Sequence, residues 1–100
     1  MYFVTVMEKC EPNEQFMALF GDSRCWGYYE HYAQAVAALR ENRTDLHEGC
    51  YNYAVIEKFG PGIVPYCEMR QWLKWDKEAK GYREIDEPEC VVHITNFAIG

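Results

Sequence analysis

The sequence lacks any apolar run that approaches the roughly 20 residues needed to span a bilayer. Its N-terminus also lacks the basic region that opens a secretory signal, and it becomes charged at Glu8. The 16 acidic residues outnumber the 10 basic ones, which disfavours general affinity for nucleic acid or for an anionic membrane. These features predict a cytoplasmic protein without a membrane partner, for which nucleic acid is an unfavoured partner.

A Cys-x-x-Cys metal-binding motif and a disulfide framework are missing as well. The five cysteines stand singly and far apart, and none forms a Cys-x-x-Cys motif; they are Cys10, Cys25, Cys50, Cys67 and Cys90. An odd count at wide spacing argues against a disulfide framework. Two histidine–cysteine pairs have close spacing, His47-x-x-Cys50 and Cys90-x-x-His93, but they stand far apart in the chain, and free cysteines are commonly core residues. The sequence therefore predicts no metal and no cofactor.

Phosphate-binding loops are missing too. The Gly60-Pro61-Gly62 turn lacks a run of backbone donors, because proline has no N–H, and no Walker or Rossmann spacing occurs. No catalytic constellation stands out, so the chain is more readily interpreted as a non-enzyme.

What the sequence does hold is a large share of aromatic residues, 16% of the chain, and a pattern of short strands around one helix. Apolar residues from His31 to about Asn42 recur at helical spacing, with Tyr32, Val36 and Leu39 on one stripe. The β-branched and aromatic stretch 51–59 is the clearest strand. The other predicted strands are 1–9, 24–29, 69–75, 82–86 and 91–97, with 16–20 as a further short one.

These elements predict a single α+β domain over residues 1–100, with the helix packed on a mostly antiparallel sheet of five to six strands. We expect the helix to pack against both Val55 and Ile56. Gly27 predicts a bulge in its strand or a close approach of another backbone segment, and Gly81 is placed where a hairpin needs a left-handed residue. Residues 11–14 are expected to form a turn because of Pro12.

One hairpin departs from the acidic character of the chain. Residues 70–83 carry five basic residues against two acidic ones, and residues 84–89 carry four acids and no base. Trp72 and Trp75 lie among the bases and point to opposite faces of a strand. One ring is expected in the core and the other outside, near Arg70 or Lys74. The outer ring would stack on the nucleobases of single-stranded nucleic acid. A solvated hairpin that guards a sheet edge is the simpler interpretation.

The sequence resembles a group of small, uncharacterised bacterial proteins in three segments. They are the helix with Ala33, the stretch Tyr51-x-Tyr-Ala-Val-Ile-Glu and the ending Asn-Phe-Ala-Ile-Gly100. Some members of this group come from phage or mobile elements. The resemblance implies a stand-alone domain and a shared fold; residues 10–24 depart from it. Since the group has no assigned activity, the resemblance implies no functional residues.

These observations favour a small non-enzymatic module that binds a protein partner as an accessory or inhibitor. A homodimer is also expected through the sheet face that the helix leaves open, because the first strand is apolar on both sides. The alternative is a small enzyme or nucleotide-binding domain in which His93 acts with a nearby thiol or carboxylate. Candidate binding residues are Arg70, Trp72, Lys74, Trp75, His47 and His93.

Overall fold

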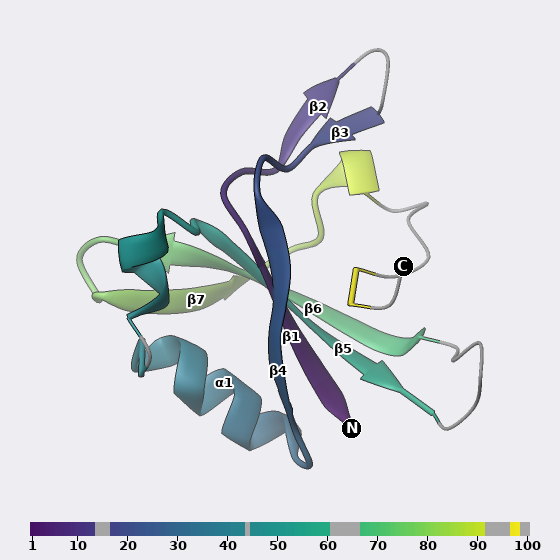
Figure 1. Ribbon diagram of the computed structural model, residues 1–100, viewed down its shortest axis with the longest axis vertical. Helices are drawn as coiled ribbons and strands as arrows, with labels where there is room; N and C mark the ends of the chain where they lie inside the picture. Colours follow the sequence, from purple (N-terminus) through teal and green to yellow (C-terminus); the bar gives the residue numbers. More distant parts are fainter. Residues whose placement is uncertain (14–16, 44, 61–66, 92–96, 99–100) are drawn as a thin grey trace.

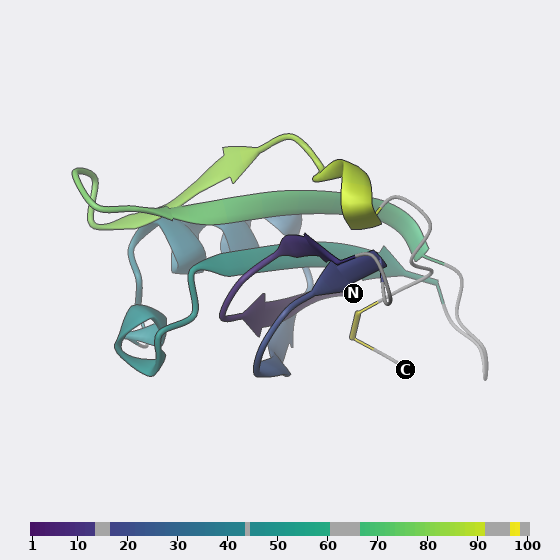
Figure 2. The ribbon, with the colours of Figure 1, turned by 90° about the horizontal axis from the view of Figure 1, so that it is seen from above.

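The computed structural model describes residues 1–13, 17–43, 45–60, 67–91 and 97–98. Over these ranges the chain forms a five-stranded antiparallel sheet with one α-helix against it, so the predicted α+β fold is confirmed. The strands lie in the order β4 (Ser23–Tyr29), β1 (Tyr2–Met7), β5 (Tyr53–Phe59), β6 (Cys67–Asp76) and β7 (Gly81–Ile85). Figure 1 looks towards the β4 edge, and Figure 2 shows the strands following one another from β7 to β4.

The connection between β4 and β5 determines the topology. Both strands pair antiparallel with β1, which lies between them, so β4 and β5 run parallel to each other. Parallel strands need a long crossover, here supplied by α1 (Tyr32–Arg40) and the 3₁₀ turn η1 (Leu46–Gly49). Among the described strands, β4 and β7 are therefore left as the two edges of the sheet.

Helix α1 covers one face of the sheet. Its buried stripe of Ala35, Val36 and Leu39 packs with residues from the central strands, among them Val4 and Ile56. The Gln34 side-chain oxygen accepts the His31 N–H at the start of the helix, which takes the place of a Ser or Asp cap. This packing confirms the predicted stripe.

The prediction that α1 contacts both Val55 and Ile56 is wrong for Val55. Successive side chains on a strand point to opposite faces, so only Ile56 faces the helix. Val55 packs instead with Met7, Trp72 and Val91 on the second face.

The second face is covered by the chain's own segments. Strands β2 (Glu11–Asn13) and β3 (Met17–Leu19) form a small separate sheet, and the 3₁₀ turn η2 (Glu89–Val91) follows β7. Figure 1 shows the β2–β3 hairpin and η2 on the side of the molecule away from α1. Phe20, Cys10, Cys90 and Phe97 pack against the apolar cluster beneath them. The two-sided apolar character of the first strand thus has an explanation within one chain.

Three further predictions need correction or fall outside the described ranges. Residues 11–13 form β2 where a turn was expected, because a proline is tolerated in a two-stranded ribbon that leaves one edge unpaired. The left-handed residue of the β6–β7 hairpin is Lys80, with φ of 54°, whereas Gly81 already belongs to β7. The predicted strand 91–97 begins instead in η2, and its residues 92–96 lie outside the described part. The bulge expected at Gly27 is confirmed by a register shift opposite Val4 and Thr5.

Tyr82 provides a test of the core under α1. It is fully buried, and its hydroxyl donates to the Tyr51 carbonyl. Burial raises the pKa of Tyr82 to about 12, whereas a tyrosine in an unfolded chain ionises near pH ~10. As the pH rises, the unfolded chain thus loses this proton before the folded chain does. The contribution of Tyr82 to the free energy of unfolding is therefore complete below about pH 10. It declines by about 1.4 kcal/mol per pH unit as the pH rises towards about 12. Urea unfolding across this range should show a steeper loss for the wild type than for Tyr82→Phe; equal slopes would contradict the assignment.

Candidate functional site

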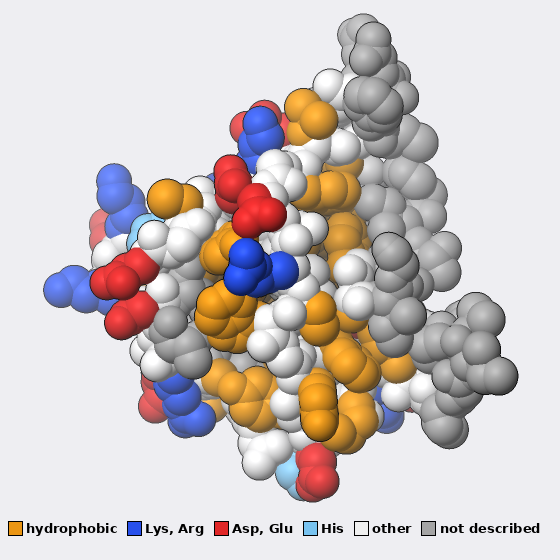
Figure 3. All heavy atoms as spheres, viewed as in Figure 1, with side chains coloured by type: hydrophobic (Ala, Val, Ile, Leu, Met, Phe, Trp, Pro, Cys, Tyr) orange, Lys and Arg blue, Asp and Glu red, His pale blue; other side chains and the backbone are white. Residues whose placement is uncertain are grey.

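The β4 edge of the sheet is the most exposed aromatic surface in the described part of the chain. Trp26 is 41% exposed and Tyr28 is 61% exposed, although both belong to a strand. Arg24 is the one charged residue of β4, whereas the opposite edge, β7, carries Arg83 and Glu84 in five residues. Edge strands are normally guarded by charge or by a covering segment. Figure 3 shows hydrophobic side chains gathered over the face that β4 crosses.

The bulge explains why these rings are arranged as they are. It shifts the β4–β1 register between Val4 and Thr5, so that Trp26 lies on the α1 side of the strand and Tyr28 on the other. Trp26 makes an edge contact with the Tyr51 ring, with the ring centroids 6.4 Å apart. The Arg24 guanidinium lies 5.9 Å from the centroid of the Trp26 ring, within range of a cation–π interaction. Trp26 is therefore held in place while much of its surface stays accessible.

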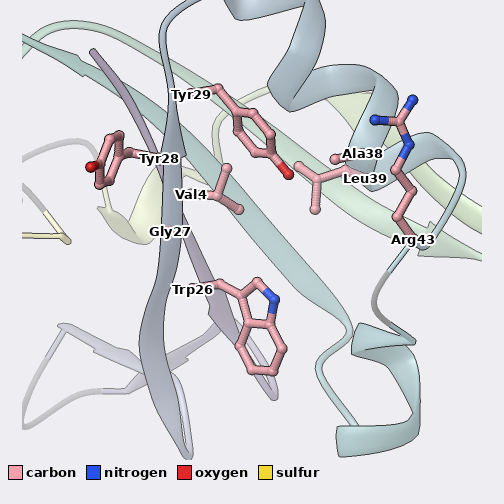
Figure 4. Close-up of a pocket in the computed structure, with 8 residues that line it drawn as sticks. All are labelled: Val4, Trp26, Gly27, Tyr28, Tyr29, Ala38, Leu39 and Arg43. Atoms are coloured by element: carbon pink, nitrogen blue, oxygen red, sulfur yellow. The ribbon is translucent and has the colours of Figure 1, made fainter.

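A cavity of about 180 Å³ opens beside this edge, between β4 and α1. Figure 4 shows Trp26, Tyr29, Val4 and Leu39 around it, with Tyr28 on the other side of the strand. Arg43 lines the cavity beyond the end of α1, where it forms an ion pair with Glu41 at 2.5 Å. The lining is mostly apolar and aromatic with one cationic group, which suits an apolar side chain better than a charged substrate.

Gly27 helps to leave the outer edge of β4 accessible. A Cβ built there meets nothing within 4 Å, so the strand is open at its bulge. In the sequence Gly27 stands out for its backbone, whereas Trp26 and Tyr28 were not predicted as binding residues. A signal was present, because β4 carries three large rings in seven residues with a single charge.

A second notable group of residues is buried on the other face. Glu57 has no exposed surface, and its carboxylate lies 3.1 Å from the Arg70 guanidinium. The same carboxylate accepts the backbone N–H groups of Phe97 and Ala98 at 3.0 Å each. Arg70 also pairs with Glu87 at 3.1 Å. This arrangement ties the C-terminal residues to the sheet, and because its hydrogen-bonding groups are engaged with protein groups it has the features of a structural clamp.

The structure brings two of the predicted binding residues together. The His47 and Trp75 rings stack with centroids 3.9 Å apart and planes 6° apart, and Trp75 packs on the core beneath α1. The Nδ1 atom of His47 is buried without a hydrogen-bond partner in the described part of the chain. The expectation that this second tryptophan lies outside near Arg70 or Lys74 is thus wrong, because Trp75 is half-buried between the core and the His47 ring.

The remaining predicted binding residues lie apart from this pair. Trp72 is 1% exposed and packs on the second face, so the two tryptophans do point to opposite faces as expected. The Arg70 side chain is only 13% exposed in its pairing with Glu57, and the Lys74 ammonium lies 5.4 Å from the Tyr53 ring centroid. His93 lies outside the described residues. The binding role of these residues stays a prediction.

Comparisons with known proteins do not supply a function. No family model, no curated protein and no solved structure matches the chain. Within the described residues, no helix is long and apolar enough to cross a membrane, and no group of three or more His, Cys, Asp or Glu side chains is placed to hold a metal ion.

Proposed function

We propose that this chain is a non-enzymatic module that binds an extended segment of a partner protein along β4. The observation that carries the proposal is the combination of an accessible, aromatic edge strand with an apolar cavity immediately beside it. An edge strand offers a row of backbone N–H and C=O groups that another strand can pair with, and pockets beside such an edge select the side chains.

The geometry of β4 restricts the partner's sequence. Alternate side chains of an added strand point to opposite faces of the sheet. Those on the α1 side would reach the cavity beside Trp26 and Leu39, and those on the other side would reach Tyr28 and Phe3, whose rings lie 5.7 Å apart. The segment should therefore carry apolar residues near the bulge, and the net charge of −6 favours a partner protein that is basic overall.

A second copy of the chain is the main competing occupant. Two β4 edges would pair into a continuous sheet, whereas the homodimer expected from the sequence was to form through the open sheet face. In the structure Met7 on that face is fully buried by the chain itself. Sedimentation at micromolar concentration tests both dimers; a dimer that persists and blocks peptide binding would replace the proposed partner by a second copy.

The binding proposal predicts that peptides selected from a random library will be extended and will dock on β4. Trp26→Ser removes the largest ring of the site and should weaken binding about thirtyfold, corresponding to about 2 kcal/mol for a central aromatic residue. Lys74→Ala, on the β6 face away from the cavity, is the matched control and should leave the Kd unchanged. Amide chemical shifts should change mainly in residues 23–29.

The opposite result would assign binding elsewhere. If Lys74→Ala abolishes peptide binding while Trp26→Ser leaves it intact, the site is the basic hairpin and the β4 proposal fails. Selection of no peptide by the wild type, with the fold intact by circular dichroism, would also count against it.

A further inference from the structure

The cysteines include a pair that the sequence spacing did not reveal. Cys10 lies just before β2, and Cys90 lies in η2, 80 positions later in the numbering. Both side chains line one open cavity of about 550 Å³, together with Pro12, Pro88 and Glu89. Both also pack against the apolar cluster of the second sheet face. Two free thiols from distant parts of the chain thus meet at one place.

The surroundings of the pair differ from those of the other cysteines. Cys25 and Cys50 are exposed, and Cys67 contacts the Glu57 carboxylate and the Met69 carbonyl. Burial, followed by the neighbouring Cys90 thiol, raises the pKa of Cys10 to about 12. At neutral pH Cys10 is thus held mainly as the thiol, and the thiolate is the reactive form. Because alkylation and disulfide exchange both proceed through the thiolate, both reactions of Cys10 should be slow at neutral pH and faster at alkaline pH.

We propose that Cys10 and Cys90 form a redox-active dithiol that low-molecular-weight disulfides convert into an intramolecular disulfide. In the first step one thiolate attacks the small-molecule disulfide, which forms a mixed disulfide and releases one small thiol. In the second step the other cysteine attacks the protein sulfur of that mixed disulfide, which closes the bridge and releases a second small thiol. The protein loses two hydrogens and the small disulfide is reduced to two thiols, so atoms and electrons balance.

The position of the pair predicts what the bridge would do. Cys10 precedes the β2–β3 hairpin and Cys90 belongs to η2, and these segments together cover the second sheet face. A bond between them fastens this cover across nearly the whole chain. Closing so long a loop restricts the unfolded chain, so the oxidised form should melt at a higher temperature than the reduced form.

The pair is a better candidate for a disulfide than for a metal site. Glu89 lines the same cavity, but within the described residues no three ligating side chains are close enough together to hold a metal ion. Two sulfurs with no third ligating side chain placed beside them in the described part of the chain favour bond formation between them over metal coordination.

The test treats the intact chain with oxidised glutathione at mildly alkaline pH and maps its peptides without reduction. The expected product is a monomer that has lost two hydrogens and yields one linked peptide pair containing Cys10 and Cys90. Cys10→Ser and Cys90→Ser should each prevent this product and instead carry glutathione on the remaining cysteine. Cys25→Ser is the matched control, since it removes an exposed cysteine and should still give the linked pair.

Two results would overturn the proposal, and a third would overturn the role given to the bridge. One is a map in which Cys10 and Cys90 remain free while the exposed cysteines are modified. Another is a linked pair found only in dimers, with a yield that falls on dilution, because that bridge joins two chains. The third is a linked monomer whose melting temperature equals that of the reduced form, which would show that the bridge does not fasten the cover.

Discussion

Replacing Gly81 with alanine should destabilise the fold by about 3 kcal/mol or more, because there is no space for the added methyl group. A Cβ at this position would lie 1.9 Å from the carbonyl oxygen of Arg40 and 2.8 Å from its carbonyl carbon. Both atoms belong to the backbone at the last residue of α1, so no side-chain rotation can relieve the contact. Relief requires α1 to move away from β7, which would expose the core that the helix covers.

The measurement is thermal unfolding followed by circular dichroism. For a domain of this size a loss of 3 kcal/mol corresponds to a decrease in Tm of about 12 °C or more. Gly27→Ala is the matched control, since a Cβ there meets nothing within 4 Å and its effect should stay within about 0.5 kcal/mol. If the two variants melt at the same temperature, the close approach of α1 to β7 is wrong.

Gly81 also shows where the sequence stops being informative about the fold. A glycine at the end of a polar loop favours a left-handed turn residue, which is a local inference. The actual reason for glycine here is the carbonyl of Arg40 at the end of α1, which tertiary packing brings against a residue far along the chain. Strands β1, β4, β5, β6 and β7 were predictable because their composition and alternation are local signals. The order of these strands depends on contacts between distant segments. The same contacts decide at which position only a glycine, without a side chain, can fit.

The candidate binding edge was missed in the sequence for the same reason, because it depends on contacts between distant segments. Trp26 and Tyr28 belong to a strand that was predicted, but an aromatic strand has the same composition whether it lies in the middle of a sheet or at its edge. In the structure, β4 pairs on one side with β1, and that placement makes its rings accessible. Trp72 shows the converse, because it stood out among basic residues and is almost completely buried. Exposure follows from strand order, which a single sequence does not encode locally.

Glu57 belongs to the predicted strand 51–59, where nothing in the sequence marked it out, and its carboxylate holds the backbone of Phe97 and Ala98 on the sheet. Removing its charge should therefore be costly. Glu57→Gln leaves the Arg70 guanidinium, whose side chain is 13% exposed, without its fully buried counter-charge. It also weakens the acceptor for the N–H groups of Phe97 and Ala98. Breaking a buried ion pair on one side costs about 3 to 5 kcal/mol, so we expect a loss of about 3 kcal/mol with Glu87 still present.

Urea unfolding compares this variant with Glu68→Gln, the matched control. Glu68 pairs with Lys58 at 3.5 Å on the surface, with 47% and 42% of the two side chains exposed, so its loss should cost no more than about 0.5 kcal/mol. Equal stabilities of the two variants would contradict the clamp.

The local readout of the clamp is tryptophan fluorescence. The Phe97 ring packs edge-on against Trp72 with the centroids 5.2 Å apart, and the Glu57 carboxylate holds the Phe97 backbone N–H. Glu57→Gln should therefore loosen this contact and shift the Trp72 emission to longer wavelength in the folded state, whereas Glu68→Gln should not.

A double-mutant cycle separates the clamp from simple packing. Arg70→Gln alone leaves the Glu57 carboxylate buried without its guanidinium partner, so it should be about as destabilising as Glu57→Gln. When both are changed, no uncompensated charge remains at this position, and the double variant should be more stable than the sum of the single losses predicts, by about 1 to 3 kcal/mol. Strict additivity would mean that the two side chains act independently. A positive coupling would identify Glu57 and Arg70 as one unit, in which the carboxylate is stable in the core because the guanidinium and the C-terminal backbone donors surround it.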